Sequence, residues 1–86
     1  MNAPAKIPAI EAIIEMLDLI ETLERLDRAP DAILKTIETL GGGVWFAGGG
    51  YTARYRGVVG TSTVGGAALV KSWMRAARRR IEGAQA

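Results

Sequence analysis

The sequence predicts a small α+β domain with the element order α-α-β-β-α. Three observations support this class. Apolar residues recur every three or four positions up to Leu40, alternate at every second position after Gly43, and return to the helical spacing after Gly65. The predicted architecture is a helical hairpin that, with a C-terminal amphipathic helix, covers one face of a two-stranded antiparallel hairpin.

The first helix is expected from Ala9 to about Asp27. Its apolar residues form two adjoining stripes, one made of Ile10, Ile13, Leu17 and Ile20 and the other of Met16, Leu19, Leu23 and Leu26. A helix with so wide an apolar face needs neighbours on two sides. Glu11, Glu15 and Asp18 fall on the opposite face, where we predict a contact with a protein partner.

A second helix is expected to begin at Pro30 and Asp31. Proline has no N–H to leave unpaired in a first helical turn, and an aspartate favours the positive end of the helix dipole. The apolar side of this helix consists of Ile33, Leu34, Ile37 and Leu40. Gly41 then supplies a residue that can adopt a positive φ just past the end, so the two helices should form an antiparallel hairpin.

The sheet is predicted from residues 44–59. The run VWFA at 44–47 favours a first strand, and glycines 48–50 fit a hairpin loop that requires positive φ. A second strand is expected to continue to Val59, with Tyr51, Ala53, Tyr55, Gly57 and Val59 on a buried side and Thr52, Arg54, Arg56 and Val58 on a solvated side. Tyrosines and arginines are therefore expected on opposite faces, which argues against a base-stacking platform.

The glycine-rich stretch 48–53, GGGYTA, also matches the G-x-G-x-x-A fingerprint of nucleotide-binding loops. That fingerprint works only where a helix begins at the glycines and presents free N–H groups to a pyrophosphate. Here the alternation predicts a strand after the glycines, and no acidic residue lies about 20 residues further on. We interpret the glycines as part of a hairpin.

The third helix is expected from about Gly65 to Ile81, after a capping sequence at residues 61–63. Its apolar face consists of Leu69, Val70, Trp73, Ala77 and Ile81. Its opposite face carries Lys71, Arg75, Arg78, Arg79 and Glu82. Basic residues that recur every four positions along about 12 Å of helix are spaced to meet several phosphates.

The charges of the chain are unevenly distributed. Residues 1–40 carry eight acidic and four basic side chains, whereas residues 41–86 carry one acidic and seven basic ones. This asymmetry predicts either a polyanionic partner for the basic half or complementary pairing between the halves. The candidate residues for contact with a polyanion or a protein partner are Arg54, Arg56, Lys71, Arg75, Arg78 and Arg79.

The composition argues against catalysis. The chain has no cysteine and no histidine, which removes thiolate nucleophiles, zinc–thiolate sites and the usual general base. Paired carboxylates on the first helix lie opposite its apolar face, where burial cannot separate their pKa values. We therefore expect no catalytic residue, no metal site, no cofactor and no small-molecule substrate.

The termini and the location follow from composition. We expect a flexible N-terminus at residues 1–8, a single domain at 9–82 and a flexible tail at 83–86. The chain shows no signal-peptide pattern and no apolar run near the roughly 18–20 residues that a bilayer requires. The expectation is a cytoplasmic protein without a membrane partner.

The stretch from Tyr51 to Ile81 resembles the final strand and helix of several small bacterial and prophage-type proteins. It is also similar to the strand-to-helix half of HicB-like antitoxins and of double-stranded-RNA-binding domains. The helical hairpin before it belongs to neither family, and the third strand of the RNA-binding domain is not predicted here. The resemblance implies a small accessory or regulatory protein.

The predicted function is non-catalytic binding. The leading hypothesis is a small accessory or regulatory protein that acts through protein contacts, as a homo-oligomer or as an inhibitor encoded by a phage-like element. The alternative is a protein that binds the DNA or RNA backbone through its basic C-terminal helix.

Overall fold

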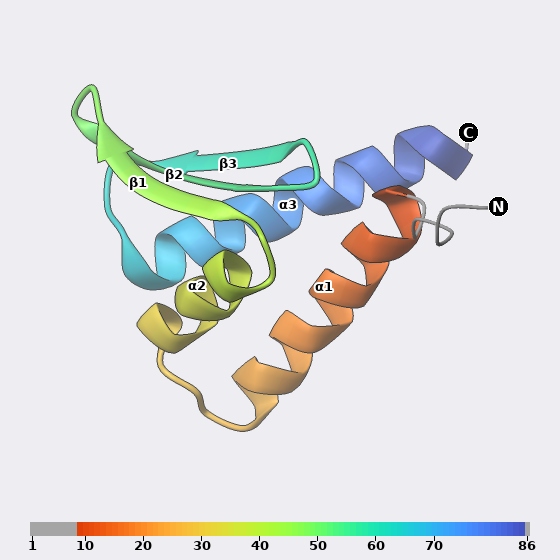
Figure 1. Cartoon of the computed structure of the whole chain (residues 1–86), viewed down its shortest axis with the longest axis horizontal. Coiled ribbons are helices and arrows are strands. Elements are labelled where there is room, and N and C mark those ends of the chain that lie inside the picture. The colour runs from red at the N-terminus through yellow and green to blue at the C-terminus, as the bar shows by residue number, and fades with distance from the viewer. Residues whose placement is uncertain (1–8, 86) are drawn as a thin grey trace, which may run out of the picture.

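The computed structural model describes residues 9–85 and has the element order α-α-β-β-β-α (Figure 1). The elements are α1 (Ala9–Arg25), α2 (Pro30–Thr39), β1 (Gly43–Ala47), β2 (Gly50–Tyr55), β3 (Val58–Ser62) and α3 (Gly66–Gln85). The predicted α+β class is confirmed, but the sheet has three strands rather than two. The expected flexible N-terminus, residues 1–8, lies outside the described residues, as does Ala86.

The third strand results from a turn at Arg56 and Gly57. Both residues have positive φ, 51° and 80° respectively, which is typical of a type I′ hairpin turn. The prediction of one strand through to Val59 is therefore wrong, because a turn at this point reverses the chain. The turn also reverses the predicted orientations: Val58 is buried at 2% exposure, whereas Val59 is 47% exposed.

The sheet is antiparallel with the strand order β1-β2-β3. The first hairpin turns at Gly48 and Gly49, whose φ values are 62° and 81°, and its closing pair is Ala47 opposite Gly50. The expectation of a glycine hairpin at this point is confirmed. In the second hairpin the closing pair is Tyr55 opposite Val58.

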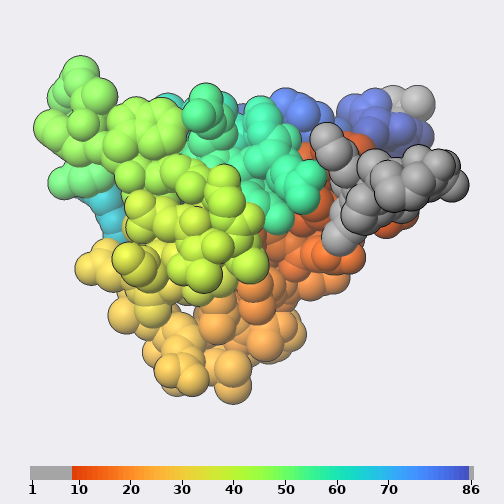
Figure 2. All heavy atoms as spheres, viewed as in Figure 1, coloured from red at the N-terminus to blue at the C-terminus, as the bar shows by residue number. Residues whose placement is uncertain are grey.

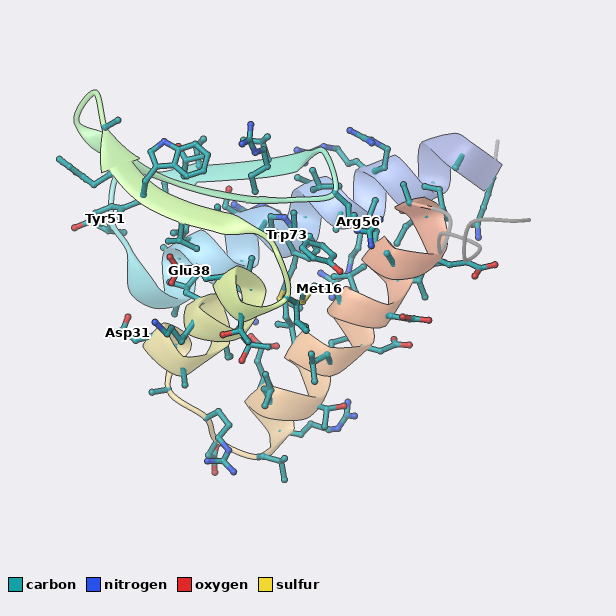
Figure 3. All side chains as sticks on the ribbon, viewed as in Figure 1. Met16, Asp31, Glu38, Tyr51, Arg56 and Trp73 are labelled. Atoms are coloured by element: carbon teal, nitrogen blue, oxygen red, sulfur yellow. The ribbon has the colours of Figure 1, made fainter. Side chains whose placement is uncertain are left out.

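The three helices lie on one side of the sheet, and the other side carries no described helix (Figure 1). Trp73 lies at the centre of the core, between the sheet and α1 (Figure 3). Its side chain is fully buried, its Nε1 donates a hydrogen bond of 3.1 Å to the carbonyl oxygen of Val58, and its ring meets Tyr55 edge-on at 6.2 Å between centroids. The rest of the core comes from all three helices and the inner side of the sheet: Ala12, Ile13, Met16, Leu17, Ile20, Ile33, Leu34, Ile37, Ala53, Val58, Leu69, Val70, Met74 and Ala77.

Helix α3 and strand β3 approach each other closely at Gly60. A Cβ atom built on Gly60 would lie 2.4 Å from the backbone nitrogen of Trp73 and 2.5 Å from its Cα. Only a residue without a side chain fits at this distance. Gly60 therefore sets how deeply α3 can pack on the sheet, and with it the position of Trp73.

The boundaries of α3 differ from the prediction. Residues 61–63 do not cap it; the hydroxyl of Ser62 instead accepts a hydrogen bond of 3.2 Å from the Val64 N–H, in the turn before the helix. The helix continues beyond Ile81, so Gly83 to Gln85 are helical although the sequence assigned them to a tail. Helix α1 ends at Arg25, and Asp27 adopts a positive φ of 57° in the turn that follows.

Candidate functional site

The basic face of α3 is partly neutralised by the acidic helix α1. Lys71 Nζ lies 3.3 Å from a carboxylate oxygen of Glu24, and Arg78 donates a hydrogen bond of 2.9 Å to Glu21. These pairs are partly exposed, so each contributes at most about 1 kcal/mol to stability. We call the four cations on this face, which were predicted to meet phosphates, the row: Lys71, Arg75, Arg78 and Arg79. Two of the four are already in ion pairs. Complementary pairing between the two halves, one of the two alternatives raised by the charge distribution, occurs within this single chain.

The other two cations of the row, Arg75 and Arg79, are exposed. No carboxylate among residues 9–85 forms an ion pair with either guanidinium. These two arginines are the members of the row that are available to an outside anion.

The three acidic candidates on α1 do not take part in the pairing. Glu11, Glu15 and Asp18 are exposed and form no ion pair within the described part of the chain. The carboxylates that meet α3 lie further along the helix, at Glu21 and Glu24. Glu11, Glu15 and Asp18 are available for the predicted protein contact but lie on a different element from the exposed sheet residues.

The two candidate arginines of the sheet do not extend the basic face of α3. Arg54 lies on the sheet side turned away from the helices, and its guanidinium stands 5.4 Å from the ring centroid of Trp45. Arg56 is in the β2–β3 turn, 5.9 Å from the ring of Tyr55. Arg80, which was not among the candidates, donates a hydrogen bond of 3.0 Å to the Gly57 carbonyl in the same turn. The six predicted cations therefore lie on more than one surface.

The outer side of the sheet carries an exposed cluster that we call the outer-face patch. The register places Trp45 opposite Thr52, Thr52 opposite Thr61, and Arg54 opposite Val59, and together these five residues form the patch. Trp45 is 40% exposed and Val59 47% exposed. The patch combines an aromatic ring, an aliphatic side chain, two hydroxyl groups and one cation.

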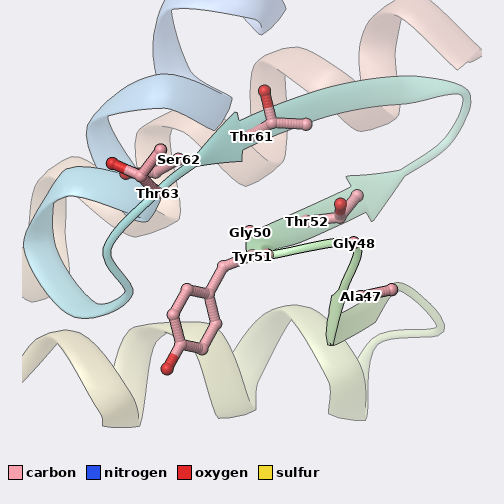
Figure 4. Close-up of a pocket in the computed structure, with 9 residues that line it drawn as sticks. Ala47, Gly48, Gly50, Tyr51, Thr52, Thr61, Ser62 and Thr63 are labelled. Carbon is pink, nitrogen blue, oxygen red and sulfur yellow. The ribbon is translucent and has the colours of Figure 1, made fainter.

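A shallow hollow lies at the tip of the first hairpin (Figure 4). It has a volume of about 490 Å³ and is lined by residues 47–52 and 61–63. The lining residues with polar side chains are Tyr51, Thr52, Thr61, Ser62 and Thr63. Because no lysine, arginine or carboxylate lines it, the hollow offers neither a counter-charge for a phosphate nor a side-chain base for catalysis.

Two further features bear on the kind of site. In the described range, 9–85, no group of three or more carboxylates could hold a metal ion. Among the same residues, none of the helices is both long enough and apolar enough to cross a bilayer.

Comparison of the chain with protein-family models, with curated proteins and with solved structures gave no match.

Sequence reasoning missed Trp45 as a surface residue and Glu21 and Glu24 as ion-pair partners. A signal for Trp45 was present in the two-residue loop at Gly48 and Gly49. That loop places Trp45 opposite Thr52, and residues directly opposite each other in a sheet share a face. Tyr51 and Tyr55 lie on the helix side as expected, but Trp45 shares its face with Arg54.

Proposed function

We propose that this chain is a small, non-catalytic cytoplasmic protein with an accessory or regulatory role, and that it binds another protein through the outer-face patch. The observation that carries the proposal is the exposed Trp45 on an uncovered sheet face, with Arg54 of β2 above its ring and Val59 of β3 opposite Arg54. Tryptophan and arginine are enriched among the residues that contribute most to protein–protein binding.

The geometry of the patch favours binding because the Trp45 ring already packs against neighbouring residues of its own chain. The Trp45 ring extends over Gly43, where a Cβ atom would lie 3.0 Å from a ring carbon, and the Arg54 guanidinium stands on the ring. A side chain held in place before binding loses less conformational entropy when a partner arrives. The patch is therefore better prepared for binding than an equally apolar but mobile side chain would be.

The charge pairing supports a protein partner over a polyanion as the leading proposal. Lys71 and Arg78 would have to leave Glu24 and Glu21 before they could contact phosphates. Trp45 and Val59 need no such rearrangement. An inhibitor encoded by a phage-like element is one form that this function would take, and it rests on the resemblance of residues 51–81 to small prophage-type proteins.

The test compares the proteins that the full chain retains from extracts of its native host. We expect Val59→Lys to lose a protein that the wild type retains, because the substitution places a charge in the patch. Leu26→Lys is the matched control, since Leu26 is 62% exposed but lies in the α1–α2 turn, away from the sheet. If every retained protein is bound equally by all three chains, the outer-face patch is not the binding surface.

A second candidate function is binding to a nucleic-acid backbone through α3. Two observations favour it: Arg75 and Arg79 form no ion pair among the described residues, and β3 supplies the third strand that a likeness to double-stranded-RNA-binding domains requires. If only these two arginines contact phosphates, the logarithm of the affinity for duplex DNA should fall with the logarithm of salt concentration with a slope of about −1.8. Fluorescence anisotropy across a salt series measures this slope.

The variants separate the two arginines from the rest of the row. Replacing Arg75 and Arg79 together with glutamine should remove the salt dependence, whereas Arg54→Gln should leave it unchanged. A slope near −3.6 would mean that all four cations contact phosphates and that both ion pairs open on binding. An absence of binding to duplex DNA and RNA at low salt would eliminate this candidate.

A further inference from the structure

Strand β1 forms an open edge of the sheet. Its five residues, GVWFA, include no charge and no proline, and the register contains no bulge. Charged side chains, prolines and bulges are the features that ordinarily prevent an edge strand from pairing with another chain. Figure 2 shows β1 on the near face of the molecule, with no helix in front of it.

The register identifies the backbone groups on this edge. A two-residue loop makes Ala47 and Gly50 a hydrogen-bonded pair, so Trp45 and Gly43 also direct their backbone groups toward β2. Val44 and Phe46 therefore direct their N–H and C=O groups outward. Within residues 9–85, neither residue forms a hydrogen bond with a side chain or with backbone outside the sheet.

The β3 edge of the sheet differs, because α3 covers part of it. Tyr55 and Val58 are the closing pair of the second hairpin, so Thr61 and Val59 face outward on that edge. The hydroxyl of Ser72 accepts a hydrogen bond of 3.1 Å from the Thr61 N–H and donates one of 2.6 Å to the Thr61 carbonyl. These contacts agree with the assignment by register, and they leave only Val59 with outward backbone groups on this edge.

We propose that β1 pairs antiparallel with β1 of a second copy of this chain, about a two-fold axis at Trp45. This inference goes beyond the proposed function, because the pairing uses the edge of β1 and a second copy of the chain, whereas Val59 on β3 takes no part in it. With Trp45 opposite Trp45 of the second copy, Val44 lies opposite Phe46 of the second copy and Phe46 opposite its Val44. All outward N–H and C=O groups of the two strands are then satisfied by four hydrogen bonds, and the two sheets join into one.

The side chains on the outer face fit this register. Trp45 occupies the non-hydrogen-bonded position on the axis, where opposite side chains approach most closely. The Trp45 ring extends over its own Gly43, which lies opposite Ala47 of the second copy. Because these two residues are small, each ring has room over Gly43 beside Ala47 of the second copy.

The inner face fits as well. Phe46 is 60% exposed, although it meets Tyr51 edge-on at 4.8 Å between ring centroids. In the paired state Phe46 of the second copy lies opposite Val44, beside a hollow of about 340 Å³ between α2 and the sheet. The apolar part of that hollow is lined by Leu34, Val44, Tyr51 and Leu69. Pairing would therefore cover the exposed phenyl ring with an apolar surface that is already present.

The first test is a direct cross-link. The chain has no cysteine, so Trp45→Cys introduces a single thiol on the proposed axis. Residues opposite each other at a non-hydrogen-bonded position have Cα atoms about 4.5 Å apart, within the range that a disulfide spans. We expect mild oxidation of Trp45→Cys to give a covalent dimer of twice the 9.1 kDa chain mass, and oxidation of Val59→Cys, at a similarly exposed position on β3, to give no covalent dimer.

The second test measures association without a cross-link. Sedimentation equilibrium from micromolar to millimolar concentration should show the wild type and the control Leu26→Lys forming dimers. Phe46→Pro removes one outward N–H and the phenyl ring but no hydrogen bond to β2, so it should raise the dimer dissociation constant at least tenfold. Trp45→Lys, which leaves the backbone unchanged, should do the same by placing two ammonium groups opposite each other. Circular dichroism establishes that each variant is folded.

A wild type that remains monomeric throughout this range, or equal cross-linking of Trp45→Cys and Val59→Cys, would overturn the pairing. If the monomer still retains another protein that Val59→Lys loses, only this inference fails and the proposed function stands. If the chain is monomeric and retains no protein through the patch, both fail.

Discussion

Replacing Trp73 with alanine is expected to lower the free energy of unfolding by about 3–5 kcal/mol, because the substitution leaves a large cavity at the centre of the core. Trp73 is fully buried and connects α3 to the sheet through its ring and its indole N–H. Urea unfolding followed by far-ultraviolet circular dichroism measures the change. A domain of this size has a free energy of unfolding of only about 4–13 kcal/mol, so the substitution removes a large fraction of the total stability.

The variant Trp73→Phe separates volume from hydrogen bonding. It retains an aromatic ring in the core but removes the hydrogen-bond donor to the Val58 carbonyl. The lost hydrogen bond alone should lower the free energy of unfolding by about 0.5–1.5 kcal/mol. A Trp73→Ala protein with an unchanged urea midpoint would show that the residue is not the anchor between α3 and the sheet.

Replacing Gly60 with alanine is expected to cost about 3 kcal/mol, the upper end of what overpacking usually costs. The added methyl group would lie 2.4–2.5 Å from backbone atoms of Trp73, and a backbone cannot move aside as a flexible side chain can. Relief requires α3 to move away from β3, which also strains the Trp73 hydrogen bond to Val58. Thermal unfolding should show a melting temperature many degrees lower.

Gly50→Ala is the matched control for this experiment. Gly50 is also a strand glycine, but the nearest atom to its added Cβ is the Ser62 carbonyl oxygen at 3.4 Å. A small effect at Gly50 together with a large one at Gly60 would assign the cost to the α3–β3 approach. Equal effects at both positions would instead indicate a general penalty for side chains in these strands.

The helices and the fold class could be predicted from the sequence, because their signals are local. The spacing of apolar residues identified α1, α2 and α3, and Pro30 marked the first turn of α2. The third strand was missed because its turn contains Arg56 at positive φ, where glycine, asparagine or aspartate is usual. In addition, the alternation of residues between the two faces can be continued through Arg56 and Gly57 as if they belonged to one strand. No break in the sequence pattern therefore marks the turn.

The candidate surfaces could be predicted only in part, because they depend on contacts between distant residues. The sequence showed that the two halves carry opposite charge. It did not show that Glu21 and Glu24, rather than the acidic residues nearer the N-terminus, would meet Arg78 and Lys71. That outcome depends on the angle and register between two packed helices, which no local pattern specifies. The exposure of Trp45 likewise depends on which side of the sheet the helices cover.

The hydrogen bonds between Ser72 and Thr61 bear on how large an assembly of this protein can become. A sheet with two open edges could add further copies at both edges indefinitely, as amyloid fibrils do. Here the Ser72 hydroxyl of α3 binds the outward N–H and C=O of Thr61 on the β3 edge, which leaves the β1 edge as the one fully open to strand pairing. Any association through the strands is therefore self-limiting at a pair, which makes the serine a safeguard against fibre formation.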